Sequence, residues 1–450
     1  MLHPRGGRRS TRLPQMPDDR DLPTSRLGRL VRFAGLGTRA GLEKIAGKFG
    51  RSGSEAALAA AAAKALGTMR GLALKLGQMA SYVDGFVPEE HRQLYEDAMR
   101  SLRDAAPTMP TEAVRRVVES ELGRPPESLF AEWCEAPIAS ASLGQVHRAC
   151  LHDGRQVAVK VQYEGVADAV AADLANSEIL GTLLRPVSSK FGLAEQLAEM
   201  RARFLEELDY LHEAQAQKSF AAVFTAASQI KIPAVIHELT SRRVLTTELA
   251  TGLKFDAACS SNEEDRKAWA ETLWRFVFAN LLGPGCFNAD PHPGNYLFGP
   301  QGRVCFLDFG CTRTLSEKSA ARVHRIHQAI LNDDLGEFFK GAHEMLGIPE
   351  NVKQAKYMRD YLLLCFEPMR ARRPYRLTHK YASQLMAELR AGAREQLLGS
   401  RNEFVPLPAE FLFFNRLQLG FYSVLARLDV TVDYRALHSK ILSPARAQWR

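Results

Sequence analysis

The chain has 450 residues, of which 46% are hydrophobic, 24% charged and 8% aromatic. These values are typical of a folded globular protein and exclude a disordered or collagen-like chain. The length exceeds that of a usual single domain, so two lobes, or two domains with an appendage, are expected. The seven cysteines are odd in number, widely spread and without a CxxC pair. This usage favours a reducing compartment over a disulfide framework or a zinc site.

The formal net charge of +8 is concentrated at the start of the chain. Residues 1–50 hold eleven Lys/Arg against four Asp/Glu, and the rest of the chain is nearly neutral. Such a basic arm can touch an anionic membrane, a nucleic acid or an acidic partner, or it can be a solvated tail. No nucleic-acid motif or aromatic-interleaved basic stripe accompanies it, so nucleic acid is not expected as a partner.

Membrane contact, where it occurs, is expected to be peripheral, because no apolar run approaches the ~20 residues that cross a bilayer. The start of the chain has no apolar signal core. The sequence therefore predicts a cytoplasmic protein with peripheral contact at the inner membrane. A mitochondrial location is the alternative, although Asp18, Asp19 and Asp21 are unusual in a mitochondrial presequence.

Residues 51–130 are predicted to form a helical extension. Ser52 and Glu55 make a capping-box pattern that opens a long, alanine-rich helix with one apolar face. Further helical periodicity covers about 86–104 and 111–122.

The hydrophobic period changes at about residue 136 from helical to alternating. The runs "SLGQVHRACL" and "RQVAVKVQY" alternate on either side of "HDG", which predicts two strands joined by a turn. Helical patterns follow at about 165–184 and 193–224, and then two more strand-like runs, "KIPAVIHEL" and "RRVLTTELA". Beyond residue 263 the chain is mostly helical, apart from "NYLFG" and "RVCFLDFG", which predict a short hairpin.

Asp290 and Asn295 lie in "ADPHPGN", and Asp308 follows in "LDFG". The order D-x4-N-x12-D-F-G is typical of a phosphoryl-transfer site, which needs a carboxylate to orient the attacking oxygen and oxygen ligands for Mg²⁺. Asp290 is the predicted orienting residue, and Asn295 and Asp308 are the predicted metal ligands. Pro291 and Pro293 restrict the loop and hold these groups in position.

Lys160 ends the strand pattern "VAVK", where kinases place the lysine that anchors the nucleotide phosphates. A glutamate from a nearby helix holds that lysine, and the predicted helix 193–224 is rich in acidic residues. Helical geometry puts Asp209 and Glu213 on one face and Glu207 on another. Glu213 is the predicted partner of Lys160, and acids that only solvate a helix surface are the alternative.

The loop predicted to cover the phosphates reads "PIASASLGQVH" and has no GxGxxG motif. Alanine and serine carry a Cβ, so this backbone cannot approach the phosphates as freely as glycine would. The nucleotide, ATP or ADP, is therefore expected to be held differently from that of an ordinary protein kinase, with the connection at 248–252 beside the adenine. Besides Lys160 and Glu213, the predicted nucleotide-binding residues are Ala139, Ser140, Ala141, Ser142, Gly144, Gln145, Glu248 and Ala250.

Four separated motifs make the chain resemble the AarF/UbiB family of atypical, protein-kinase-like kinases linked to ubiquinone biosynthesis. They are "KLGQ" at 75–78, "ASASLGQVH" at 139–147, "ELDYLHEA" at 207–214, and "ADPHPGN" with "LDFG". The resemblance implies a regulatory group, made of Lys75, Gly77, Gln78, Glu207 and Asp209. In it, Lys75 lies on a helix folded across the cleft and meets Glu207 or Asp209, where it obstructs the place of a protein substrate. An alanine-rich helix with an exposed lysine is the alternative.

Two departures from the family pattern stand out. Asn288 occupies the position of a histidine two residues before the catalytic aspartate, and asparagine can still hydrogen-bond the loop. Some relatives end in a membrane-spanning pair, whereas "LPAEFLFFNRLQLGFYSVLARLDV" is interrupted by Asn415, Arg416 and Gln418. That segment is predicted to be an amphipathic packing helix.

The sequence thus predicts an α+β, protein-kinase-like two-lobed fold, with a basic arm at 1–50, a helical extension at 51–130, an N-lobe at 131–250 and a helical C-lobe at 251–450. The predicted function is that of a magnesium-dependent atypical kinase or ATPase. The resemblance implies support of ubiquinone or another isoprenoid-lipid pathway at a membrane surface. Expected partners are the nucleotide, an isoprenoid lipid or quinone precursor, biosynthetic proteins, and an anionic membrane that the basic arm would touch. The alternatives are a small-molecule kinase of the aminoglycoside or choline type and a catalytically silent, nucleotide-binding scaffold.

Overall fold

We analysed a computed structural model of the chain. The structure describes residues 109–141, 143–168, 206–225, 227, 229–349, 353–398 and 407–443. The basic arm, the helices expected between residues 51 and 104, and Ser142 lie outside the described residues. So do Lys75, Gly77 and Gln78.

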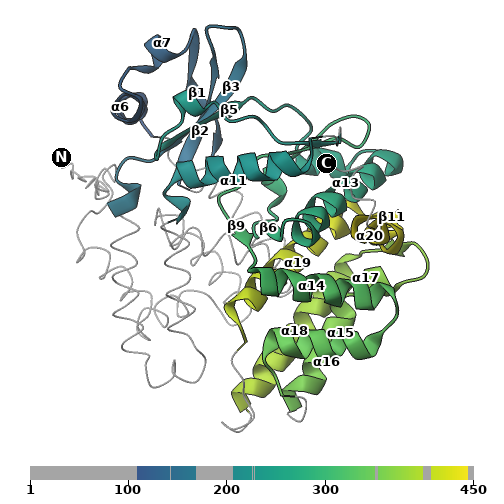
Figure 1. Cartoon of the computed structure of the whole chain (residues 1–450). Coiled ribbons are helices and arrows are strands. Elements are labelled where there is room, and N and C mark those ends of the chain that lie inside the picture. The colour runs from purple at the N-terminus through teal and green to yellow at the C-terminus, as the bar shows by residue number, and fades with distance from the viewer. Residues whose placement is uncertain are drawn as a thin grey trace, which may run out of the picture. The chain divides into compact units, whose positions relative to one another are not determined.

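A four-stranded antiparallel sheet forms the first lobe (Figure 1). In spatial order its strands are β1 (Glu132–Ser140), β2 (Gly144–Cys150), β3 (Gln156–Gln162) and β5 (Val244–Glu248). The predicted turn between β2 and β3 is confirmed, and Gly154 takes the left-handed φ of 86° that this turn requires. β1 extends as far as Ser140, so much of the segment expected to cover the phosphates is strand.

Two helices before β1 pack against this sheet. They are α6 (Thr111–Leu122), at the bounds that the sequence predicts, and the short α7 (Pro126–Leu129). The left-handed Gly123 ends α6 by donating its backbone N–H to the carbonyl of Glu119. Apolar side chains of α6 and alternate residues of β3 form one core, which contains Val114, Val117, Val118, Val157, Val159 and Val161. The core of the sheet lobe therefore includes residues on both sides of position 130.

Helix α11 (Tyr210–Val223) connects the sheet lobe to the second lobe. The sequence predicts one continuous helix over 193–224, but this helix begins only at Tyr210. Asp209 is its N-cap: its backbone is extended, and its carboxylate accepts a hydrogen bond from the Leu211 N–H at 3.0 Å. The prediction that Asp209 and Glu213 share a helical face is therefore wrong, because Asp209 precedes the first helical turn.

The run "KIPAVIHEL" does not form the strand that its pattern predicts. It contributes Lys231 to the two-residue β4 (Ile230–Lys231), which pairs in parallel with β8, an isolated bridge from Val235 to Thr247, and a turn of 3-10 helix (His237–Leu239). Pro233, two residues after Lys231, has no N–H for a strand ladder, which accounts for the early end of β4. The following run does form β5.

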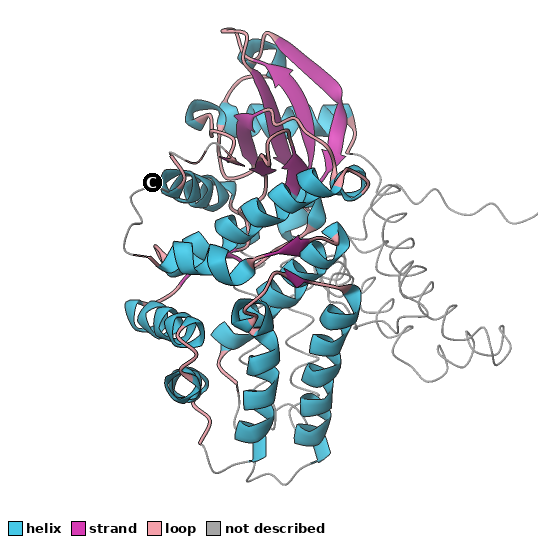
Figure 2. Cartoon of the chain, turned by 90° about the vertical axis from the view of Figure 1, so that its right-hand side faces the viewer, coloured by secondary structure: helices cyan, strands magenta, loops and turns pink. Residues whose placement is uncertain are grey.

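The second lobe is mostly helical (Figure 2). Its helices are α12 (Phe255–Cys259), α13 (Glu263–Leu282), α14 (Glu317–Leu331), α15 (Leu335–Leu346), α16 (Lys353–Cys365), α17 (Glu367–Arg370), α18 (His379–Leu398), α19 (Ala409–Leu428) and α20 (Tyr434–Leu442). The strand pair β10 (Tyr375–Arg376) and β11 (Thr431–Val432) completes it. Trp274 of α13 is fully buried and packs against Tyr434 of α20. None of the helices in the described ranges is long and apolar enough to cross a bilayer.

Two pairs of short strands hold together the loops of this lobe that carry the predicted site residues. The predicted hairpin is confirmed as β7 (Tyr296–Phe298) and β8 (Val304–Phe306). Before and after it, β6 (Cys286–Asn288) pairs antiparallel with β9 (Thr312–Thr314). The segments that carry Asp290, Asn295 and Asp308 therefore emerge side by side.

Candidate active site

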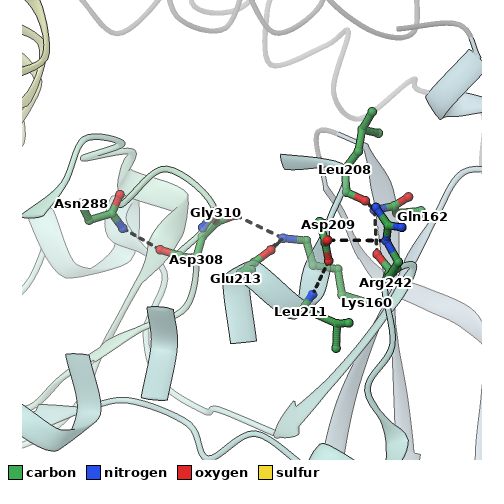
Figure 3. Close-up of polar contacts among 10 residues, drawn as sticks. All are labelled: Lys160, Gln162, Leu208, Asp209, Leu211, Glu213, Arg242, Asn288, Asp308 and Gly310. Carbon is green, nitrogen blue, oxygen red and sulfur yellow. Dashed lines mark hydrogen bonds and ion pairs between the residues drawn. The ribbon is translucent and has the colours of Figure 1, made fainter. Parts of the chain in front are cut away.

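The ammonium group of Lys160 lies between two carboxylates (Figure 3). Its Nζ donates to both carboxylate oxygens of Glu213 at 2.9 Å and lies 3.4 Å from Oδ2 of Asp308. The lysine comes from β3, the glutamate from α11 and the aspartate from the segment after β8. Three segments that are distant in sequence thus meet at one cation.

Lys160 and Glu213 are both largely buried, so each shifts the pKa of the other. The side chains of Lys160 and Glu213 are 15% and 4% exposed. Burial opposes the charged lysine, but the carboxylates of Asp308 and Glu213 outweigh it and raise the pKa of Lys160 well above its ordinary value. Burial raises the pKa of Glu213, and Lys160 opposes that rise. Lys160 is therefore cationic at neutral pH, as a phosphate-binding group must be.

A cleft of about 480 Å³ opens beside Lys160, and both lobes contribute to its walls. This volume lies within the range of small-molecule sites, roughly 300–1,000 Å³. Of the residues predicted to bind nucleotide, it is lined by Ala139, Lys160, Glu213, Glu248 and Ala250. Apolar side chains cover much of the rest, among them Val146, Ala158, Leu245, Leu249, Leu297 and Leu307.

The predicted phosphate-covering loop enters this cleft less than expected. Among its described residues that were predicted to bind nucleotide, Ala139 lines the cleft, whereas Ser140, Ala141, Gly144 and Gln145 do not. Successive residues of a strand face opposite sides, so β2 presents Val146 to the cleft and turns Gln145 away from it.

Gln145 has a role inside the sheet lobe. Its Oε1 accepts the backbone N–H of Met109 at 2.9 Å, and its Nε2 lies 2.9 Å from Nε2 of His147. The side chain of Gln145 is buried and joins β2 to the segment that leads into α6. Gln145, which the motif predicted to bind the nucleotide, therefore makes an internal contact of the lobe instead.

Asn288, the departure from the family pattern, bridges the two loops of the site. Its Nδ2 donates to the main-chain carbonyl of Asp308 at 2.6 Å, and its Oδ1 accepts the backbone N–H of Asp290 at 3.0 Å. Further along the loop, Nδ2 of Asn295 donates to the carbonyl of Asp290 at 3.3 Å. The expectation that asparagine can hydrogen-bond the loop is confirmed.

Asn295 and Asp308, the predicted metal ligands, are an amide and a carboxylate. One oxygen of Asp308, Oδ1, accepts the backbone N–H of Gly310 at 2.9 Å, which fixes the side chain. Magnesium usually takes one or two protein carboxylates together with waters and phosphate oxygens, so this sparse donor set fits a cation bound along with a nucleotide. Within the described ranges, no cluster of three or more His, Cys, Asp or Glu forms a protein-only metal cage.

Glu207 and Asp209, the acidic pair of the predicted regulatory group, lie just before α11. The segment is tied to the sheet by Gln162, whose Nε2 donates to the carbonyl of Leu208 at 2.8 Å. The carboxylate of Asp209 lies 3.5 Å from Nε of Arg242. The proposed partner Lys75 is outside the described residues.

Sequence reasoning missed Arg416 as a site residue. This arginine of α19 places Nη2 3.2 Å from Oδ1 of the candidate catalytic Asp290. Asn415 and Gln418, beside it, also have internal partners, at Tyr361 and at the carbonyl of Cys365. The predicted packing helix is confirmed, but these polar residues have partners inside the lobe and do not form a water-facing side of the helix. The sequence did hold a signal for Arg416, which is a cation in the middle of a mostly apolar 20-residue helix. Such a group is rarely buried unless an acidic residue pairs with it.

Comparison with known proteins places the chain in a family. Residues 101–340 match the family described as the ABC1 atypical kinase-like domain. The mitochondrial atypical kinase COQ8B of Rattus norvegicus is 28% identical over 450 residues, covering 94% of this chain and 82% of that protein. The probable serine/threonine-protein kinase abkA of Dictyostelium discoideum is 29% identical over 392 residues, covering 82% of this chain and 68% of that protein.

A solved structure of Rv3197 from Mycobacterium tuberculosis, in complex with erythromycin, matches with a TM-score of 0.60 and 26% identity. The match covers 84% of this chain and 93% of that chain. The predicted kinase-like fold, with a small antiparallel sheet followed by a helical lobe, is confirmed. The chain belongs to the ABC1 atypical kinase-like family, the AarF/UbiB family that its motifs resemble.

Proposed function

We propose that the chain is an atypical kinase or ATPase that binds ATP or ADP with Mg²⁺ in the cleft beside Lys160. The observation that carries this proposal is the buried contact of Lys160 with Glu213, both on the wall of a nucleotide-sized cleft, together with the approach of Lys160 to Asp308 at 3.4 Å. A lysine held by a helix glutamate, next to a metal-binding aspartate, is the arrangement that kinases use to anchor phosphates.

The adenine would lie between apolar residues of the two lobes. Ala158 and Val146 line the cleft from the sheet, and Leu297 lines it from the hairpin of the second lobe. The carboxylate of Glu248 already accepts hydrogen bonds from the Ala234 N–H at 3.1 Å and from Lys231 at 3.2 Å. The base would therefore be recognised by the main chain of the connection rather than by this side chain.

The phosphates would extend toward Lys160. Asn295 and Asp308 would hold Mg²⁺, which when bound neutralises charge on the phosphates. Asp290 would orient the attacking oxygen, either a water or a hydroxyl of a small molecule or lipid, toward the terminal phosphorus. The new phosphorus–oxygen bond forms as the bond to the leaving nucleotide breaks, and the proton of the attacking group leaves to Asp290 or to solvent.

We further propose that this turnover supports ubiquinone or a related isoprenoid-lipid pathway at a membrane surface. The motif resemblance and the family membership support this part of the proposal. In this view the phosphoryl acceptor is a lipid or quinone precursor, or hydrolysis drives a conformational cycle among biosynthetic partners. Residues 1–50 would supply the contact with anionic lipid.

A test uses purified full-length chain with Mg²⁺ and ATP, in the presence and absence of anionic liposomes. Asp308→Asn is expected to abolish metal-dependent nucleotide turnover, because an amide is a weaker magnesium ligand than a carboxylate. Asp153→Asn is the matched control, since Asp153 lies on the exposed β2–β3 turn, paired with Arg155. Unchanged turnover in Asp308→Asn would remove the magnesium site from the proposal.

The competing functions give different results. A nucleotide-binding scaffold would bind ATP without turnover, and its Asp308→Asn variant would still complement a quinone-deficient strain. A small-molecule kinase would transfer phosphate to a soluble alcohol and would be indifferent to liposomes. Stimulation of the intact chain by anionic liposomes, lost on deletion of residues 1–50, would support the membrane assignment.

A further inference from the structure

One face of α19 runs along the candidate catalytic loop. Residues of α19 at helical spacing contact this loop and the neighbouring strand β9. The ring of Phe413 lies 4.8 Å from the guanidinium of Arg313 in β9, and Arg416 pairs with Asp290. Gly420 faces the ring of Pro291. Helix α19 thus contacts the loop at Asp290 and at the neighbouring Pro291.

Close packing brings the helix to this position. A Cβ added at Gly420 would lie 2.6 Å from Cγ of Pro291, so only glycine allows the proline ring to lie this close to the helix. On the neighbouring side, Phe414 stacks on Phe287 of β6, with ring centroids 5.0 Å apart. The position of α19 is therefore set directly against the residues that flank Asp290.

The ion pair is partly shielded from water. The side chains of Arg416 and Asp290 are 19% and 18% exposed, and Nη2 lies 3.2 Å from Oδ1. The other guanidinium nitrogen, Nη1, lies 3.8 Å from the sulfur of Cys311. Removing one partner of such a shielded ion pair costs more than removing one partner of an exposed pair.

Arg416 contacts the side chain of Asp290, whereas Asn288 and Asn295 contact its main chain. Asn288 and Asn295 bind the backbone N–H and carbonyl of Asp290. These bonds fix the main chain, whereas Arg416 binds the carboxylate itself and so selects its rotamer. A group that must point at an attacking oxygen loses rate when its orientation is relaxed, and a displacement of about 1 Å can cost a hundredfold.

We propose that Arg416 is a positioning residue for Asp290, which makes α19 part of the catalytic apparatus. This inference rests on the proposed function, in which Asp290 orients the attacking oxygen. Arg416 is absent from the cleft wall beside Lys160. Its loss should therefore lower kcat and leave nucleotide affinity almost unchanged.

The test compares variants of the full chain for Mg²⁺-dependent ATP turnover, for nucleotide binding by calorimetry and for thermal unfolding. Arg416→Ala is expected to lower kcat on the order of 10- to 100-fold with Kd within about twofold. Added guanidinium chloride at millimolar concentration should restore part of the rate, and sodium chloride of equal ionic strength should not. Arg416→Gln, which keeps much of the side-chain volume, should show the same loss of kcat if the alanine protein unfolds.

Arg376→Ala is the matched control. Arg376 makes a two-pronged pair with Asp429, the residue that ends α19, at 2.8 and 2.6 Å. The change removes an arginine–carboxylate pair at the C-cap of α19, whereas Arg416 contacts Asp290 from the middle of the helix. It should therefore leave kcat unchanged.

Three results would overturn the proposal: an equal or higher kcat in Arg416→Gln, an equal fall of kcat in Arg376→Ala, or no rescue of a folded Arg416→Ala protein by guanidinium. A higher kcat would mean that the ion pair holds Asp290 in an unproductive orientation. Asp290→Asn separates this inference from the proposed function. If that variant keeps full turnover, the assigned role of Asp290 fails whatever Arg416 does.

Discussion

Asn288 donates a hydrogen bond to the main-chain carbonyl of Asp308 at 2.6 Å, which joins the loop that follows β6 to the loop that follows β8. The same side chain accepts the N–H of Asp290 at 3.0 Å. An amide has both a donor and an acceptor, so one residue serves the predicted orienting carboxylate and the predicted metal ligand. The distance between these two loops therefore depends on a residue that departs from the family pattern.

We predict that Asn288→Leu lowers kcat on the order of 10- to 100-fold, because two part-buried backbone groups lose partners at a cost of about 1–3 kcal/mol each. Nucleotide affinity should change little, since Asn288 does not line the cleft. Steady-state turnover and calorimetric binding would measure both. Asn288→His, which keeps a donor and an acceptor, should retain more activity than the leucine variant, and equal activity of the two would contradict the bridging role.

Removing one partner of the Lys160–Glu213 ion pair should destabilise the protein more than replacing both partners by apolar residues. Lys160→Met is expected to reduce the free energy of unfolding by about 3–5 kcal/mol, because it leaves the buried Glu213 carboxylate without its cation. The double variant Lys160→Met/Glu213→Leu should recover a large part of this loss. Urea unfolding of Lys160→Met, Glu213→Leu and the double variant completes the double-mutant cycle. Turnover should be absent from all three, and stability losses that simply add would show that the pair is not coupled.

Gly420→Ala tests the packing of the Pro291 ring against α19. Alanine in a helix interior normally stabilises by up to about 1 kcal/mol relative to glycine. Here the added methyl meets the Pro291 ring at 2.6 Å, so a lower melting temperature and a lower kcat are expected. Gly336→Ala in α15 is the control, because the nearest atom to its added Cβ is the Asp334 side chain at 3.4 Å. A gain of stability at position 420 with full activity would argue against close packing there.

A histidine pair in the core of the helical lobe predicts acid sensitivity. His327 Nδ1 lies 2.8 Å from His438 Nε2, and both side chains are buried. Burial lowers the pKa of His327 to about 3 and lowers the pKa of His438 well below its ordinary value. In the unfolded chain the pKa of each histidine is about 6.5. The unfolded state thus binds more protons below that pH, so this stability is fully present above pH 6.5 and is lost on acidification toward pH 3.

The expected slope is about 1.4 kcal/mol for each histidine and each pH unit below 6. Chemical unfolding at several values between pH 7 and pH 5.5 would measure it, a range in which most carboxylates stay ionised. The double variant His327→Leu/His438→Leu removes both groups and should flatten the dependence. An equally steep loss of stability in that variant would place the titrating groups elsewhere.

Local sequence patterns predicted those parts of the molecule that depend on near neighbours along the chain. Alternation around "HDG" identified β2 and β3, and helical spacing gave α6 its bounds. The same reasoning failed at Asp209, where an aspartate that fits a helix interior by spacing instead caps the first turn. It also assigned Gln145 to the nucleotide, because a motif does not state which face of a strand is turned to the cleft.

By itself the sequence determined the types of chemical group in the site and their order, since Lys160, Asp290, Asn295 and Asp308 were identified by spacing and residue type. Only the tertiary structure decided which groups meet them. Arg416 lies 126 residues from Asp290 along the chain, and Asn288 lies 20 residues from Asp308. Such contacts depend on how the helices and strand pairs pack, because packing is set by side-chain volumes summed over the whole lobe and leaves no signature at fixed spacing.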